Sequence, residues 1–331
     1  MNRTILAVCI LTLVVMLSPL SARGQQEGLT IYSGRSESLV EPLVRSFQEH
    51  TGIPVQVRYG GTSELAVLIT EEGRRSPADL FWAQDAGGLG AVTRSGLFQE
   101  LPPSLWQEVP PLFRSDSAHW IAASGRARLF AYSTQRTTPG ELPDSIFDLT
   151  DIRYRSRVGW APTNGSFQAF LTGMRLVHGD EVTLAWLEAM GSQDTQSYRN
   201  NTSLVEAIAA GEIDFALVNN YYLGRFTSVD PDFPVAQDFF SLGDIGNMVN
   251  TAGIGILASS SNREKALEFI RYLLSDVAQS FIVEELGEFP AAALDDTGSY
   301  QDLLTLSPGI DLDGLADLEG TLAIMRQAGL L

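Results

Sequence analysis

Between Leu29 and Ala83 the sequence alternates short apolar strands with amphipathic helices, and this alternation restricts the fold more than any other feature. The first helix is expected to begin near Ser38, because Ser38 and Glu41 are spaced as a capping box and Pro42 then falls in the first turn. The order β-α-β-α-β predicts an α/β fold whose ligands bind beyond the carboxyl ends of the strands. The predicted strands are Leu29–Tyr32, Ile53–Tyr59 and Ala78–Ala83, and the helices run from Ser38 to about Gly52 and from Ser63 to about Gly73.

A second unit of the same kind follows further along the chain, with strands predicted at Val158–Ala161 and Ile213–Val218. Of its two helices, one follows the loop at 162–166 and the other follows Asn201–Ser203, with Ser203 and Glu206 spaced as a capping box. A chain of 331 residues exceeds the size that one hydrophobic core supports, so two lobes are expected. Two extended apolar stretches, Arg128–Tyr132 and Ala252–Leu257, are predicted to join the lobes as a hinge. The predicted lobes comprise residues 25–125 with 255–305, and 126–254 with 306–331.

The N-terminus has the pattern of a secretory signal peptide. Arg3 precedes an apolar run from Ile5 to Leu17, and a small-residue cleavage site ends at Gly24, so residues 1–24 are predicted to be removed. Their removal takes away Cys9, the only cysteine, and with it any thiol or disulfide chemistry. The mature protein is therefore expected to be a soluble protein of the periplasm.

Charge and motifs limit the function. The net charge of −18 argues against nucleic acid or an anionic membrane surface as a partner, because both would repel the protein. The sequence contains no Gly-x-Ser-x-Gly elbow, no His-Glu-x-x-His and no phosphate-binding loop, and its three histidines are predicted to lie at the periphery. These patterns favour a binding protein over an enzyme. A hydrolase with an unrecognised site is the alternative from a different class.

Two adjacent tyrosines, Tyr221 and Tyr222, follow the strand predicted at Ile213–Val218. An ionised phenol is a hard, anionic oxygen donor, so such a pair suits a hard trivalent cation such as Fe3+. The alternative is that both rings simply pack in a core, as aromatic side chains commonly do.

Three loops rich in Ser, Gly and Asn lead into predicted helices: Ser33–Ser36, Asn164–Ser166 and Asn201–Ser203. Unpaired N–H groups and the helix dipole favour an anion at such positions. Arg35 strengthens this interpretation for the first loop, because a guanidinium can hold an oxyanion with two hydrogen bonds. The alternatives are that the loops are only helix caps and that Arg35 pairs with Glu37 or Glu41 at the surface.

Six blocks of sequence together resemble the periplasmic ferric-ion-binding proteins of ABC transporters. The similarity covers nearly the whole mature chain in the same order. It implies a two-lobed type II periplasmic binding protein fold, in which each lobe is a mixed sheet flanked by helices and a two-stranded hinge joins them. It further implies a non-enzymatic protein that holds Fe3+ in the interlobe cleft and delivers it to an ABC transporter permease in the inner membrane. The blocks are Tyr32–Arg35, Glu71–Phe81, Ser124–Arg126, Val158–Thr163, Gly211–Asp214 and Asn219–Tyr222.

The resemblance also implies which residues bind the metal. Tyr221 and Tyr222 match the iron-ligating pair of the family. The chain departs from well-known members at three places, with Ser36 where they have a histidine, Gln84 where they have a glutamate, and Asn164 where a second branch has a third tyrosine. Asp85, beside Gln84, is a carboxylate that replaces the lost one. The expected metal-site residues are therefore Tyr221, Tyr222, Asp85 and Gln84.

Two tyrosinates leave most of the coordination sphere of Fe3+ unfilled, so a synergistic carbonate or phosphate is expected to complete it. Arg35 is similar to the carbonate-binding arginine of some members, and Arg126 is a further candidate. We expect a monomer that closes over one ion and one small anion. The alternative on the same fold is a metal-free binding protein for a small oxyanion or organophosphonate, with the tyrosines only as cleft walls. The expected anion-binding residues are Arg35, Ser36, Asn164, Gly165, Ser166, Asn201 and Asn219.

Overall fold

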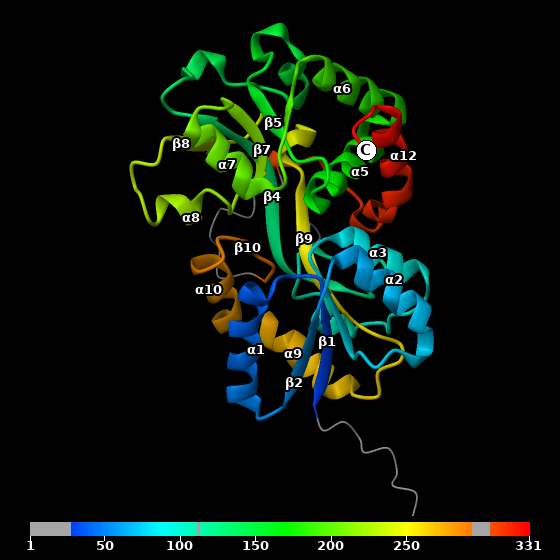
Figure 1. Cartoon of the computed structure of the whole chain (residues 1–331). Helices are drawn as coiled ribbons and strands as arrows, with labels where there is room; N and C mark the ends of the chain where they lie inside the picture. Colours follow the sequence, from blue (N-terminus) through cyan, green and yellow to red (C-terminus); the bar gives the residue numbers. More distant parts are fainter. Residues whose placement is uncertain (1–27, 111–112, 293–304) are drawn as a thin grey trace, which may run out of the picture.

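The computed structural model describes residues 28–110, 113–292 and 305–331, and the chain forms two lobes joined by two long strands (Figure 1). The predicted signal peptide lies outside the described residues. A single path of paired strands runs through both lobes in the order β2-β1-β3-β9-β4-β7-β5-β6. The strands on the β2 side form the N-terminal lobe, and those on the β6 side form the C-terminal lobe.

The N-terminal lobe begins with the predicted β-α-β-α-β order, and β1 pairs in parallel with both β2 and β3. Helix α1 begins earlier than predicted, because Ser36 is its N-cap and Glu37 its first residue. Pro42 therefore lies in the second turn and not in the first. Gly52 ends the helix in the left-handed conformation, with φ of 72°. The elements are β1 (Leu29–Ser33), α1 (Glu37–Thr51), β2 (Val55–Tyr59), α2 (Thr62–Glu72), β3 (Leu80–Ala83), α3 (Ala86–Arg94) and α4 (Pro103–Trp106).

Strands β4 (Ile121–Ser133) and β9 (Val249–Ile256) pair antiparallel and connect the lobes. The first half of β4 pairs with β9, and its second half pairs with β7 and β8 of the C-terminal lobe. Strand β9 also pairs with β3 of the N-terminal lobe, so both strands belong to the core of the molecule. The predicted hinge of two strands is confirmed, and the residue boundaries of the lobes stay a prediction.

The C-terminal lobe repeats the α/β pattern, with β5 parallel to β6 and β7. The predicted capping box of Ser203 and Glu206 is wrong. The cap of α7 is Asn200, whose side chain accepts a hydrogen bond of 3.0 Å from the Ser203 backbone N–H. The elements are β5 (Val158–Trp160), α5 (Gly165–His178), α6 (Asp180–Ser192), β6 (Gln196–Ser197), α7 (Asn201–Ala210), β7 (Phe215–Asn219), α8 (Gly224–Thr227) and β8 (Val235–Asp238).

After β9 the chain returns to the N-terminal lobe with α9 (Arg263–Leu273), α10 (Asp276–Glu284) and β10 (Phe289–Pro290), and β10 pairs with β4. The 3-10 helix η7 (Leu312–Ala316) packs on α3, and α12 (Leu318–Gln327) packs on α5 and α6. The C-terminal segment therefore touches both lobes, although residues 306–331 were assigned to the C-terminal lobe. Other 3-10 helices span Gly73–Arg75, Pro139–Glu141, Ile146–Thr150, Ile152–Tyr154 and Ile245–Asn247.

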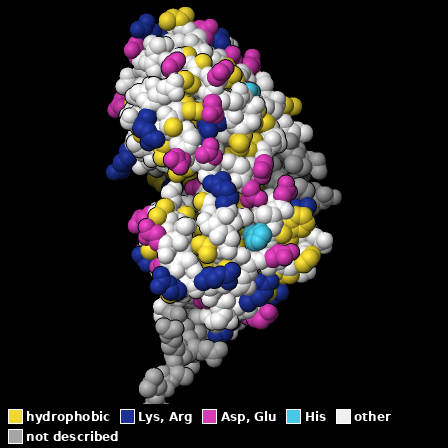
Figure 2. Space-filling model, turned by 90° about the vertical axis from the view of Figure 1, so that its right-hand side faces the viewer, with side chains coloured by type: hydrophobic (Ala, Val, Ile, Leu, Met, Phe, Trp, Pro, Cys, Tyr) yellow, Lys and Arg dark blue, Asp and Glu magenta, His cyan; other side chains and the backbone are white. Residues whose placement is uncertain are grey.

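The surface carries charges of both signs. On the face that Figure 2 shows, basic side chains (Lys or Arg) and acidic side chains are interspersed over both lobes. Within the described ranges, no helix is long and apolar enough to cross a membrane.

Candidate functional site

A cleft of about 500 Å³ lies between the lobes and brings most of the predicted site residues together. From the N-terminal lobe it is lined by Ser36, Gln84 and Asp85. From the C-terminal lobe it is lined by Asn164, Gly165, Ser166, Tyr221 and Tyr222. Three further predicted residues, Arg35, Asn201 and Asn219, are buried and do not line the cleft.

The two tyrosines lie side by side in the cleft. Their rings stack with centroids 4.5 Å apart, and the hydroxyl of Tyr221 donates to that of Tyr222 at 3.4 Å. Asn220 fixes the loop that carries them, because its backbone N–H donates to the Ala127 carbonyl and its side chain accepts from the Ala127 N–H, both at 3.0 Å. Strand β4 therefore holds the pair in place before any ligand arrives.

The phenol of Tyr222 is protonated at neutral pH in this environment. Burial raises its pKa, and the neighbouring Tyr221 raises it further. The guanidinium groups of Arg225 and Arg126 act in the opposite direction, because their positive charge favours the phenolate. A bound cation is therefore needed to displace the proton.

Two buried arginines on β4, Arg126 and Arg128, are each less than a twentieth exposed. Arg128 Nη1 donates to Asn219 Oδ1 and to Ser166 Oγ, both at 3.4 Å, and Nη2 donates to the Leu217 carbonyl at 3.2 Å. In the described part of the chain, Nη2 of Arg126 and Nε of Arg128 have no hydrogen-bond partner. Burial, reinforced by the charge of Arg126, lowers the pKa of Arg128 to about 9. Arg128 therefore remains a cation at neutral pH, and a buried cation needs negative charge nearby.

The sequence prediction missed Arg128 by treating it as the start of an apolar strand. The sequence could have indicated its role, because Arg126 and Arg128 are two residues apart and side chains at i and i+2 of a strand lie on the same face. Charged residues are also rarely buried without a partner.

Four predicted anion-binding residues form a connected network beside Arg128. Asn164 caps α5, and its Oδ1 accepts from the Ser166 N–H at 3.0 Å and from the Ser166 hydroxyl at 2.6 Å. Asn201 Nδ2 donates to Asn164 Oδ1 at 3.5 Å, and Asn201 Oδ1 accepts from the Asn219 N–H at 3.2 Å. The network orients the N-terminus of α5 toward the cleft.

Arg35 has a different partner from the two that the sequence offered. Its Nη2 donates to both carboxylate oxygens of Glu288, at 3.0 and 3.1 Å, and its Nη1 donates to the Ser124 hydroxyl at 3.1 Å. The side chains of Arg35 and Glu288 are each 1% exposed. Burial alone would raise the pKa of Glu288, but the charge and hydrogen bonds of Arg35 outweigh burial and lower it below its usual value. Two of the three guanidinium nitrogens of Arg35 are therefore engaged.

The N-terminal wall offers weaker metal ligands. Asp85 is the N-cap of α3, and its Oδ1 accepts from the Gly88 N–H at 3.1 Å. Burial raises the pKa of Asp85, although the charge of Arg126 opposes the rise. Gln84 lines the cleft, and its backbone N–H donates to the Thr62 hydroxyl at 3.0 Å. Among the described residues, no group of three or more His, Cys, Asp or Glu side chains could hold a metal ion.

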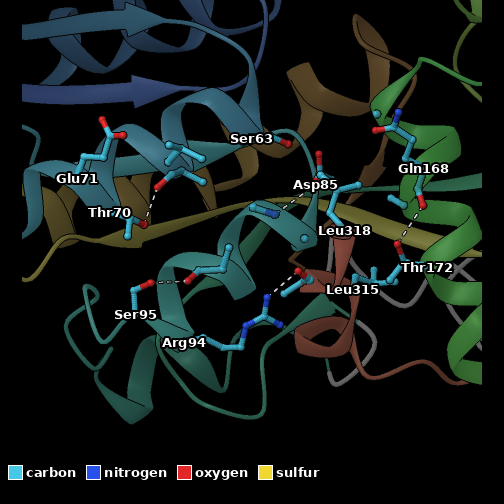
Figure 3. A pocket seen from close by; sticks show the side chains of 18 residues that line it. Ser63, Thr70, Glu71, Asp85, Arg94, Ser95, Gln168, Thr172, Leu315 and Leu318 are labelled. Atoms are coloured by element: carbon cyan, nitrogen blue, oxygen red, sulfur yellow. Dashed lines mark hydrogen bonds between the residues drawn. The ribbon is translucent and has the colours of Figure 1, made fainter. Parts of the chain in front are cut away.

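A second cavity of about 470 Å³ continues from the cleft (Figure 3). It shares Ser63, Asp85, Gly165 and Gln168 with the cleft and extends between α2, α3 and α5 to Leu315 and Leu318. Arg94 closes its far side by donating to the Ala316 carbonyl at 2.6 Å. The space between the lobes therefore reaches from the tyrosines to the C-terminal segment.

Arg225 was not predicted, yet it lines the cleft. Its guanidinium carbon lies 5.6 Å from the ring centre of Tyr221 and 5.1 Å from that of Tyr222. Arg225 follows Tyr221 by four residues and Tyr222 by three. Residues at these spacings lie on one face of a helical turn, so the sequence could have predicted this contact.

Comparisons with known proteins agree with this architecture. A family model described as bacterial extracellular solute-binding protein matches residues 32–280. The Fe(3+)-binding periplasmic protein of Serratia marcescens is 30% identical over 317 residues, which cover 94% of this chain and 93% of that protein. The major ferric iron-binding protein of Neisseria meningitidis serogroup B is 28% identical, with 91% and 93% covered.

Among solved structures, iron-bound HitA from Pseudomonas aeruginosa superposes with a TM-score of 0.84 and 30% sequence identity, and the match covers 92% of this chain and 99% of that one. The predicted type II periplasmic binding fold and the resemblance to the ferric-ion-binding proteins are thereby confirmed. The family consists of binding proteins and not of enzymes. The chain belongs to the bacterial extracellular solute-binding protein family.

Proposed function

We propose that this protein binds Fe3+ in the interlobe cleft through Tyr221 and Tyr222 and delivers it in the periplasm to an ABC importer. The relatives named above, which bind ferric iron, support the ion. The single observation that carries the proposal is the position of two buried cations, Arg126 and Arg128, near two stacked tyrosines. Neutral phenols add no counter-charge for these cations, whereas phenolates on a metal ion add one; Asp85 and Glu288 are the carboxylates that already interact with the charge of Arg126.

The charges of the proposed metal site and of the nearby arginines favour the binding of an anion as well. Fe3+ with two phenolates keeps one positive charge, and two arginines add to it. We therefore propose that carbonate or phosphate completes the coordination sphere. Arg126 Nη2 is a buried donor without a partner in the described residues, so it is suited to hold this anion. Ser36, Asn164, Gly165 and Ser166, which line the cleft, complete the proposed anion site.

Arg35 has one nitrogen left for an anion, Nε, which is buried without a partner among the described residues. Its Nη2 is held in a buried ion pair with Glu288 and its Nη1 bonds Ser124, and breaking such a pair is costly. Asn201 and Asn219 act indirectly in this proposal, because they hold Asn164 and Arg128 in place. Asp85 is the carboxylate that the N-terminal lobe adds on closure.

One observation favours the metal-free alternative. Unpartnered guanidinium nitrogens beside a helix N-terminus also suit a small oxyanion or an organophosphonate without any metal. The two functions differ in what the tyrosines do, because only a metal ion requires them as phenolates.

The test is the colour of the purified protein after exposure to ferric citrate. Iron-bound phenolates give a visible charge-transfer band, which should weaken in Tyr221→Phe or Tyr222→Phe and vanish in the double variant. Tyr198→Phe is the matched control, because this tyrosine contacts Glu212 outside the cleft and should leave the band unchanged. A full band in the double variant contradicts the assignment. Tight binding of phosphate or a phosphonate without any iron uptake favours the alternative.

A further inference from the structure

Two segments from different lobes are attached to nearby residues of β4. In the N-terminal lobe, β10 pairs with Ser124 and Gly125, so the turn before β10 lies beside the middle of β4 (Figure 1). In the C-terminal lobe, the tyrosine loop, residues 220–222, is bonded to the backbone of Ala127. After Ala127, β4 changes its partner from β9 to β7. The two segments therefore meet where β4 passes from one lobe to the other.

Asn220 joins these two segments directly. Its Oδ1 accepts a hydrogen bond from the Ala127 N–H at 3.0 Å, and its Nδ2 donates one to the Gly287 carbonyl at 3.1 Å. Gly287 belongs to the turn between α10 and β10 in the N-terminal lobe. A carboxylate of the same length could accept from Ala127 but could not donate to Gly287. The amide of Asn220 therefore holds the tyrosine loop to β4 with one end and to the opposite lobe with the other.

The turn that contains Gly287 also packs against the tyrosine loop. A Cβ atom at Gly287 would lie 3.5 Å from Cβ of Tyr221, which is an ordinary van der Waals contact. The next residue, Glu288, is fixed in the N-terminal lobe by its buried ion pair with Arg35. The turn therefore follows the N-terminal lobe when the lobes move, and it carries its contacts with the tyrosine loop along.

The other hydrogen bonds of the tyrosine loop behave differently. Gln237 Nε2 on β8 donates to the Asn220 carbonyl at 2.9 Å, and β8 pairs with the second half of β4. This contact lies within the C-terminal lobe, so movement of the lobes leaves it unchanged. Among these bonds, the one to Gly287 is the one whose length depends on how the lobes are placed.

We propose that Asn220 is a positioning residue that couples the tyrosine pair to the position of the N-terminal lobe through the Gly287 carbonyl. Movement of the lobes away from the present arrangement stretches this contact and frees the tyrosine loop on one side. Coupling of this kind is reciprocal, so a metal ion that fixes the tyrosines also favours one arrangement of the lobes, and that arrangement retains the metal ion. The part of the inference that concerns iron rests on the proposed function, whereas the coupling between loop and lobe does not.

The experiment measures the distance between two spin labels, one on each lobe, in the mature protein without iron. The labels are attached at Arg74→Cys and Glu188→Cys, because both positions are exposed and lie on opposite lobes. Labelling is specific, since the only cysteine, Cys9, lies in the predicted signal peptide. The wild type provides the reference distribution of distances.

Asn220→Asp separates the two functions of the side chain. It keeps the acceptor for Ala127 and loses the donor to Gly287, so the distribution of label distances should broaden. Asn220→Ala loses both contacts and should broaden it as well. Iron-loaded Asn220→Asp should release iron to a competing chelator about two- to tenfold faster than the wild type, which is the effect of one hydrogen bond. The added negative charge would by itself favour a bound cation, so faster release identifies the lost contact as the cause.

Gln237→Ala is the matched control. It removes a hydrogen bond of similar length to the same residue from within the C-terminal lobe, so the label distances should stay those of the wild type. Unchanged label distances or unchanged iron release in Asn220→Asp overturn the inference, and so does an equal broadening in Gln237→Ala. Wild-type protein that takes up no iron refutes the proposed function, while the label distances still decide whether Asn220 couples the loop to the lobe.

Discussion

The two walls of the cleft differ in how much of their polar chemistry is available to a ligand. On the C-terminal wall, the hydroxyls of Tyr221 and Tyr222 bond only to each other and Arg225 has no polar partner among the described residues. On the N-terminal wall, Asp85 caps a helix, and Arg35, which is buried and does not line the cleft, is paired with Glu288. From this difference we propose that the C-terminal wall captures the ligand and the N-terminal wall closes over it. A closed state is then favoured by the extra contacts that the N-terminal wall adds.

Glu288→Gln tests the structural character of the N-terminal side and should have the largest effect on stability. It leaves the buried charge of Arg35 without its partner, so the free energy of unfolding should fall by about 3–5 kcal/mol. Urea unfolding at neutral pH measures the loss. Glu284→Gln, an exposed position on α10, is the control and should change little.

The same pair predicts a pH dependence. The pKa of Glu288 is lower in the folded protein than in the unfolded chain, so its contribution to stability is complete above the unfolded pKa. That contribution disappears as the pH falls through the lower, folded pKa. The stability difference between the wild type and Glu288→Gln should therefore shrink on acidification. A difference that grows toward acid pH would contradict the ion pair.

Tyr222→Phe should have the largest effect on iron affinity. It removes a metal ligand, and since the loss of a group that only supports a ligand already costs about 10–100-fold, a loss of at least about 100-fold is expected. Competition with a chelator of known strength measures the change. Because a phenylalanine ring can keep the stacking of 4.5 Å with Tyr221, thermal stability should hold. A loss of stability that accounts for the loss of iron would argue against a ligand role.

Arg126→Gln should come next, with a loss of about 10–100-fold in iron affinity when carbonate or phosphate is present. The reason is that the variant removes the proposed anion donor and its charge. In anion-depleted buffer the difference between the variant and the wild type should shrink to the part that comes from the charge of Arg126 on Tyr222. An equal loss with and without added anion would show that Arg126 acts only through its charge on the tyrosines.

Asp85→Asn should have the smallest effect, about tenfold or less on iron affinity. Asparagine can still cap α3, so the variant changes the carboxylate and not the fold. Isothermal titration measures the effect, and small-angle scattering with and without iron shows whether closure survives. If Asp85→Asn proves as damaging as Tyr222→Phe, the two walls contribute equally and the proposed order of capture and closure is wrong.

Local sequence patterns predicted the fold well because each depends on neighbouring residues. Glycines mark the ends of α1 and α7, and apolar runs mark β3 and β7. The tyrosine pair was visible because it is contiguous. The partner of Arg35 was not, since Glu288 lies 253 residues away in the sequence and no local pattern joins them. The role of Arg128 was not predicted, because its neighbours in β4 are apolar and the segment was interpreted as an apolar strand.

Helix starts were the weakest predictions for a related reason. The sequence pattern of a capping box fits several neighbouring positions, and tertiary contacts decide at which of them the helix begins. Ser36 starts α1 although it makes no side-chain capping bond, and Pro42 is accommodated one turn into the helix. Asn200 starts α7 because its side-chain oxygen accepts a hydrogen bond from the Ser203 backbone N–H in the first turn.

The C-terminal segment gives the two lobes a third support. Two strands alone allow two rigid lobes both to bend and to twist relative to each other, but η7 packs on α3 of the N-terminal lobe and on α5 of the C-terminal lobe, and α12 packs on α5 and α6. Asp313 accepts from Trp120 at 2.9 Å and from Ser115 at 2.7 Å, and Thr321 bonds Thr172 at 2.7 Å. A C-terminal segment that connects the lobes at a distance from β4 and β9 hinders rotation of one lobe about the strands. Bending of the two strands then remains the easier motion. We expect the two lobes to open and close by one hinge-bending motion, so that a single distance measured across the cleft describes how far the protein is open.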